Sequence, residues 1–121
     1  MILNLLEGIN SDNYGLRLSS AFYLGEYKAS EAVIPLMKML HDEKTEEARI
    51  VAALSLMKIG SDKAVYAVKE ASSLDDSKRV RRLCILFYNA EQNGPPTEET
   101  QDLNIAERKN RDSHKKSGMT K

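Results

Sequence analysis

The chain has 121 residues, enough for one domain, and its 18 lysines and arginines balance 18 aspartates and glutamates. Charged residues make up 30% of it and apolar residues 41%, and tryptophan is absent, which is typical of a soluble helical protein with a modest core. This balance excludes a global electrostatic field that would attract nucleic acid or an anionic membrane. The single cysteine, Cys84, excludes an internal disulfide.

The first residues predict a short helix over 1–9 rather than a secretion signal. A signal needs a basic leader and an uninterrupted apolar run, but Asn4 and Glu7 interrupt this stretch. No later segment approaches the roughly 18 apolar residues that a membrane span needs. We therefore expect a cytoplasmic protein.

Five further helices are expected in chain order. Ser11, Asp12 and Asn13 offer N-cap acceptors for the first of them, and Gly25 is a plausible end for it. Pro35 predicts a late start or a slight bend in the next, because proline is tolerated only near the first turn of a helix. The predicted ranges are 13–25, 30–42, 45–58, 62–73 and 77–91.

The composition changes after residue 93. Residues 94–121 contain few apolar side chains and end in a polar, basic stretch, which cannot bury enough surface to offset its ordering entropy. We expect a helical domain over 1–93 and a disordered tail over 94–121, with a marginal helix at 98–109.

Three arginines, Arg17, Arg49 and Arg81, recur with a constant period of 32, and each precedes small and apolar residues at the same spacing. A tandem period of this length indicates stacked supersecondary units that share a core. Cys84 falls on a small position of this pattern, so we expect a buried, unreactive thiol. In the same register Ile34 falls on Ile2, which makes the N-terminal helix the second half of an incomplete leading unit and an end cap.

The segment 21–27 (AFYLGEY) followed by 30–42 (SEAVIPLMKMLHD) resembles the HEAT repeat in its bacterial, phycobilisome-lyase-like form. Units of that family read Val-Arg, small pairs, Ala-Leu-Gly, then Ala-Val/Ile-Pro-x-Leu. The resemblance covers residues 14–91, although the second unit has Met57 and Ala67 where glycine and proline are expected. It implies an all-α fold, a short right-handed, armadillo-like α-solenoid of antiparallel helix pairs with about six helices, which usually serves as a scaffold for another macromolecule.

An enzymatic function is not expected. HEAT-like deoxyhypusine hydroxylases hold two irons with recurring His-Glu pairs, but this chain has two histidines, and Ile9 and Ser73 stand one period either side of His41. No residue set matches the chemistry of phycobilin lyases, so an accessory or lyase-type function rests on the fold alone. We therefore predict no catalytic residues, no cofactor and no metal, and we interpret His41 and Asp42 as a solvated helix end.

The repeated arginines have a structural interpretation. In HEAT-like repeats such an arginine commonly pairs with an acidic residue of the preceding turn, which builds a ladder between units. The candidate acids here are Asp12, Asp42, Glu46, Asp75 and Asp76.

The basic cluster Lys78, Arg79, Arg81 and Arg82 has two interpretations. Positive charge on a first helical turn opposes the helix dipole, so the cluster and the basic tail together would suit nucleic-acid phosphates or an acidic protein. Alternatively, nearby aspartates offset the charges and the long side chains coat the outer surface.

A protein partner is the favoured prediction, through the second helices that line the concave face of such a stack. Aliphatic and aromatic anchors among polar groups suit an interface, although Ile34 and Tyr66 also suit the core. Self-association through helix 77–91 is a further prediction, because that helix lacks a partner and exposes Ile85, Leu86 and Phe87. The candidate partner-binding residues are Ile34, Lys38, His41, Tyr66, Glu70 and Ser73.

Overall fold

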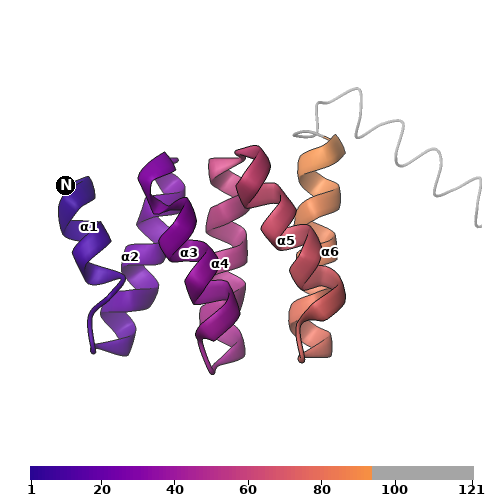
Figure 1. Ribbon diagram of the computed structural model, residues 1–121, viewed down its shortest axis with the longest axis horizontal. Coiled ribbons are helices and arrows are strands. Elements are labelled where there is room, and N and C mark those ends of the chain that lie inside the picture. The colour runs from indigo at the N-terminus through magenta and orange to yellow at the C-terminus, as the bar shows by residue number, and fades with distance from the viewer. Residues whose placement is uncertain (94–121) are drawn as a thin grey trace, which may run out of the picture.

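The computed structural model describes residues 1–93, and these form six α-helices in two layers (Figure 1). Helices α1, α3 and α5 form one layer, and α2, α4 and α6 form the other (Figure 1). The chain alternates between the layers, which confirms the expected all-α repeat solenoid. The helices are α1 (Ile2–Gly8), α2 (Tyr14–Glu26), α3 (Val33–Asp42), α4 (Glu46–Ile59), α5 (Asp62–Leu74) and α6 (Lys78–Asn93).

The helix boundaries follow local capping chemistry. The caps of α2, α4 and α6 recur with the period of the arginines: Asn13, Thr45 and Ser77 each accept a hydrogen bond from a backbone N–H of the first turn, at 2.9, 3.2 and 3.1 Å. A 3-10 turn, Ser30–Ala32, precedes α3. Pro35 thus lies in the first turn of α3, where its missing N–H costs no hydrogen bond, and the expected late start is confirmed.

The helix pairs differ from the predicted units, which joined helix 13–25 to 30–42 and helix 45–58 to 62–73. Helix α1 packs mainly against α2, α3 against α4, and α5 against α6. The prediction that helix 77–91 lacks a partner is therefore wrong, because α5 covers one side of α6. Sequence periodicity alone does not fix where a unit begins, since every starting point gives the same period.

Contact between α2 and α4 depends on small side chains. The Ser55 hydroxyl donates a buried hydrogen bond to the Ala21 carbonyl at 2.7 Å. A Cβ on Gly25 would lie 2.7 Å from the Cα of Ser55, so only glycine allows this approach. The sequence suggested that Gly25 ends this helix, but α2 continues to Glu26. The chain then turns at Lys28, whose φ is 52°.

The core runs between the layers as one continuous cluster of leucine, valine and alanine. Leu24, Leu36, Leu56 and Val68 are fully buried. Cys84 is only 1% exposed, and burial raises the pKa of its thiol to about 11, so the thiolate is scarce at neutral pH. The predicted buried thiol is confirmed.

Two buried serines provide a matched test of this packing. Ser20 occupies the place of Ala52 and Cys84, and its hydroxyl has no hydrogen-bond partner among the described residues. Ser20→Ala should leave stability unchanged or raise it by up to about 1 kcal/mol, because an unsatisfied buried hydroxyl is removed. Ser55→Ala should cost about 1–2 kcal/mol, because it leaves the Ala21 carbonyl without its donor. Urea unfolding checks both, and equal effects of the two substitutions would contradict the assignment.

Candidate protein-binding face

The candidate partner-binding residues lie on the exposed surfaces of α3 and α5. Ile34 and Tyr66 occupy equivalent positions and are 57% and 58% exposed, so neither belongs to the core. The other four, Lys38, His41, Glu70 and Ser73, are also exposed. On α3 and on α5 the three residues recur at helical spacing, which places each set along one side of its helix.

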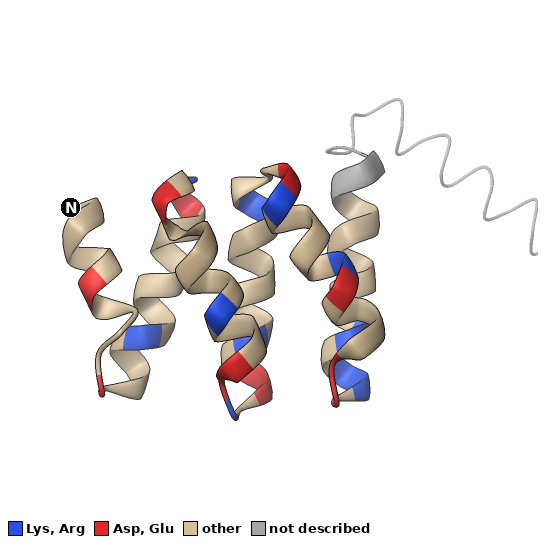
Figure 2. Cartoon of the chain, viewed as in Figure 1, with Lys and Arg blue, Asp and Glu red and all other residues tan. Residues whose placement is uncertain are grey.

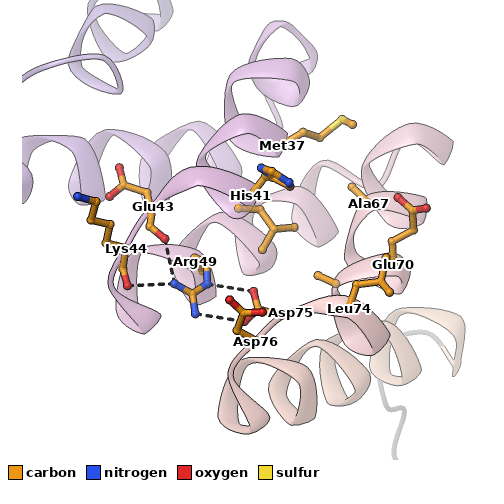
Figure 3. A pocket seen from close by; sticks show the side chains of 12 residues that line it. Met37, His41, Glu43, Lys44, Arg49, Ala67, Glu70, Leu74, Asp75 and Asp76 are labelled. Carbon is orange, nitrogen blue, oxygen red and sulfur yellow. Dashed lines mark hydrogen bonds and ion pairs between the residues drawn. The ribbon is translucent and has the colours of Figure 1, made fainter.

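A groove with a volume of about 650 Å³ separates α3 from α5 (Figure 3). His41 and Glu70 line it from opposite helices, together with the apolar side chains of Met37 and Leu74 (Figure 3). Leu74 is 75% exposed, which is unusual for leucine. Sequence reasoning missed Leu74, although a leucine at the place of Asp42 in the repeat register was a readable signal.

A second groove, with a volume of about 460 Å³, lies one repeat earlier, beside α3 and the loop between α1 and α2. Lys38 lines this groove, whereas Ile34 and Tyr66 line neither. The two grooves therefore occupy equivalent places in successive repeats, but different side chains line them. The residues of the first groove that show this are His41, Arg49, Glu70 and Leu74, which correspond to Ile9, Arg17, Lys38 and Asp42 in the second.

Arg49 forms the base of the first groove and joins two successive loops (Figure 3). Its guanidinium makes a two-point contact with the Asp75 carboxylate, Nε to Oδ2 at 3.0 Å and Nη2 to Oδ1 at 3.1 Å. Its Nη1 donates to the main-chain carbonyls of Glu43 and Lys44 at 2.9 and 3.1 Å. Both charged side chains are largely buried, 12% and 7% exposed.

Arg17 repeats this arrangement in the second groove. Its Nε and Nη2 donate to the Glu43 carboxylate at 2.8 and 3.2 Å, and its Nη1 donates to the carbonyls of Ser11 and Asp12. The hydrogen bond to Glu43 is the main reason that the pKa of Arg17 is raised. Both arginines thus donate hydrogen bonds to main-chain carbonyls of the preceding loop and to a carboxylate 26 residues later in the chain.

These contacts correct the predicted acidic partners. Asp75 does pair with a repeat arginine, but Glu43, which was not among the candidates, pairs with Arg17. Asp12 offers only its main-chain carbonyl, Asp42 contacts His41, and Glu46 contacts Arg79. The carboxylates come from the following loop because the arginine spans the interface between units.

A second set of contacts supports the same loops. The hydroxyls of Tyr14 and Thr45 lie 2.6 Å apart, and Ser77 donates to Glu46 at the same distance. In both cases the cap of one helix bonds to the first residue of the previous helix in its layer. The hydrogen bond from Ser77 is the main reason that the pKa of Glu46 is lowered.

The four residues of the basic cluster on α6 differ in their contacts and exposure. Arg79 lies 3.3 Å from Glu46 and 3.5 Å from Glu47, and Arg81 donates to the Asp75 carbonyl at 2.5 Å. Lys78 and Arg82 are exposed. Basic and acidic residues alternate along the loop edge at the lower ends of the helices (Figure 2), so this edge is not a continuous cationic surface.

The two ends of the stack expose different side chains. On α6, Ile85 and Leu86 are exposed as expected, while Phe87 is half-buried against the core. On α2, Tyr23 and Tyr27 are about half exposed at the opposite end. The expected self-association through helix 77–91 stays a prediction.

Within residues 1–93, no group of three or more histidine, cysteine, aspartate or glutamate side chains is placed to hold a metal ion. Among the same residues, none of the helices combines the length and the apolar character needed to cross a lipid bilayer.

Six helices in two layers, joined by interfaces that recur with the period of the sequence, define a helical-repeat protein of the solenoid class. A family model of HEAT repeats matches residues 2–86, and the chain belongs to the HEAT-repeat family. The match is to HEAT repeats in general and does not distinguish the phycobilisome-lyase-like form. Such repeats commonly mediate protein–protein interaction. No curated protein matches the chain.

The arginine contacts predict a stability difference between two arginines of the loop edge. Arg49→Gln should cost about 2 kcal/mol, because it leaves the mostly buried Asp75 carboxylate and two carbonyls without their donor. Arg79→Gln, which removes a pair between largely exposed side chains, should cost less than about 1 kcal/mol. The free energies of unfolding in urea test this, and a loss at position 79 equal to that at 49 would show that Arg49 is not a structural link.

His41 predicts a pH-dependent charge at the first groove. Its Nδ1 lies 2.7 Å from the Asp42 carboxylate, and this hydrogen bond, followed by the Asp42 charge, raises the pKa of His41 above 6.5. Because the folded pKa is raised, the stabilisation is fully present below the unfolded pKa and is lost as pH rises through the folded pKa. An NMR titration should give His41 a midpoint above 6.5, and Asp42→Asn should lower it. The same midpoint in both proteins would rule out Asp42 as the cause.

Proposed function

We propose that this protein is a non-enzymatic scaffold that binds a partner polypeptide along the exposed face of α3 and α5. The observation that carries the proposal is the placement of Ile34 and Tyr66, two large side chains of equivalent register that the fold leaves more than half exposed beside repeated grooves. Folding alone does not favour such exposure, whereas an interface anchor needs it.

The groove between α3 and α5 suggests the chemistry of the partner. Met37 and Leu74 supply apolar surface, and His41 and Glu70 supply polar groups at the rim. The Glu70 carboxylate raises the pKa of the Tyr66 hydroxyl, mainly by hydrogen bonding, so Tyr66 stays a neutral hydrogen-bonding anchor. A segment that inserts apolar side chains into the groove and pairs polar groups with its rim fits this surface.

Two variants test the face against a matched control. Ile34→Asp combined with Tyr66→Asp should weaken partner binding at least tenfold, because both anchors would then desolvate a charge on binding. Leu3→Asp combined with Tyr27→Asp changes two similarly exposed side chains at the end of the stack and should leave binding within about twofold. Affinity purification identifies the partner, and titration calorimetry with the purified partner measures both variants.

The outcomes of this test are distinct. Circular dichroism must show equal helicity for both variants, so that a loss of binding reflects the surface. Equal binding by both variants, or a greater loss in the control, would overturn the α3–α5 face as the site. Binding of an oligonucleotide that weakens steeply with salt and depends on Lys78 and Arg82 would instead support the nucleic-acid alternative.

A further inference from the structure

The two grooves carry opposite charges at two equivalent positions. In the first groove, Glu70, Leu74 and Asp76 line the side that α5 and the following loop form. The residues one period earlier, which belong to the second groove or its edge, are Lys38, Asp42 and Lys44. The same fold thus accepts lysines where the first groove has acids, so packing alone does not require the acids of the first groove.

Glu70 and Asp76 give the first groove a negative charge. Within residues 1–93, neither carboxylate forms an ion pair with a lysine or an arginine. The charges at the base of the groove cancel, because the Arg49 guanidinium holds the Asp75 carboxylate. The negative charge is therefore carried by two exposed side chains on either side of the exposed Leu74.

The basic side chains across the groove do not offset these acids. His41 lies 2.7 Å from the Asp42 carboxylate, so positive charge on its ring is balanced on its own helix. Lys44 lies on the far side of Arg49 from Glu70, and its ammonium group points away from the groove (Figure 3). A cation brought by a partner would thus be the counter-charge of the α5 side.

Tyr66 supports the Glu70 carboxylate beside the groove. The two residues lie one turn apart on α5, and their side chains interact mainly by hydrogen bonding, which raises the pKa of the tyrosine. A neutral hydroxyl donor orients the acid without removing its charge. An acid that is already oriented loses less side-chain entropy when it binds a cation.

The apolar side chains of the groove recur at helical spacing. Ala67, Ala71 and Leu74 lie along α5, and Met37 and Leu40 line the groove from α3. Between positions 67 and 74 an α-helix rises about 10 Å, which is roughly two turns. Two neighbouring helices with such apolar stripes accept a third helix between their ridges. The groove therefore fits about two turns of an amphipathic helix.

We propose that the first groove binds an amphipathic helix of a partner protein in which a lysine or arginine flanks the apolar stripe and contacts Glu70. This inference rests on the proposed function, because it names the chemistry of the partner for the same face. The helix buries its apolar side chains against Met37 and Leu74. A partner helix with an acid at the flank is rejected, since like charges would then meet beside Glu70 and Asp76.

Selection of a random peptide library against the full chain tests the chemistry of the occupant. We expect the selected peptides to carry lysine or arginine three or four residues from large apolar residues. Binding of these peptides, synthesised with a fluorescent label, should weaken at least about tenfold in Glu70→Lys, because two cations would then face one another. Fluorescence anisotropy measures the dissociation constants, and circular dichroism checks that the variants keep equal helicity.

A matched control and a reciprocal change separate this contact from general attraction. Glu7→Lys makes the same change of charge at an exposed acid of α1 that lines neither groove, and should alter binding less than about twofold. Replacing the cation of the peptide with glutamate should restore binding to Glu70→Lys. Equal losses in Glu7→Lys and Glu70→Lys, or no restoration by the exchanged peptide, would overturn the proposed contact.

The selected peptides also distinguish this inference from the proposed function. Peptides that need Ile34 and Tyr66 but carry no cation, or that bind Glu70→Lys unchanged, would overturn the inference and leave the α3–α5 face standing. Peptides that bind Ile34→Asp with Tyr66→Asp as tightly as the unchanged chain would count against the face itself. A selection that yields no binding peptide would count against both.

Discussion

The contact on which the structure depends is the link from each repeat arginine to two successive loops. In a solenoid each unit touches only its neighbours, so stability is close to a sum of interface contributions. Arg17 and Arg49 lie at two such interfaces, and each holds a carboxylate from one loop and carbonyls from another. A cation on the first turn opposes the helix dipole, but here it is offset by these acceptors, so the arginine fixes the relative position of loops that share no backbone hydrogen bonds.

Small side chains set the spacing at the interface between α2 and α4. Gly25 approaches the backbone of Ser55, and the Ser55 hydroxyl donates to Ala21, so these two helices lie close together. A larger residue at either place would force them apart. One period later, between α4 and α6, the equivalent residues are Met57 and Phe87, and Arg49 still binds Asp75 as Arg17 binds Glu43. The arginine link therefore recurs where the small residues do not, and the grooves recur with the arginines that line them.

The helices, the period and the structural use of the arginines were predictable because they depend on local patterns: caps, apolar spacing and a residue type that recurs. The partner of Arg17 was not predicted, because Glu43 is distant in sequence and becomes close only when two units stack; a search for acids at constant distance from each arginine would have revealed it. The exposure of Ile34 and Tyr66 was left open for a related reason. An apolar side chain at helical spacing suits either a core or an interface, and only the position of the neighbouring helix decides between them. Leu74 shows the value of comparing units, since a leucine replaces a charged residue at its repeat position.

The grooves beside α3 and α5 are formed by helices that Arg17 and Arg49 already hold in place. Substitutions on the exposed sides of α3 and α5 change the chemistry of this face without touching the arginines or the small residues, so the repeat separates the residues that hold the fold from those available for binding.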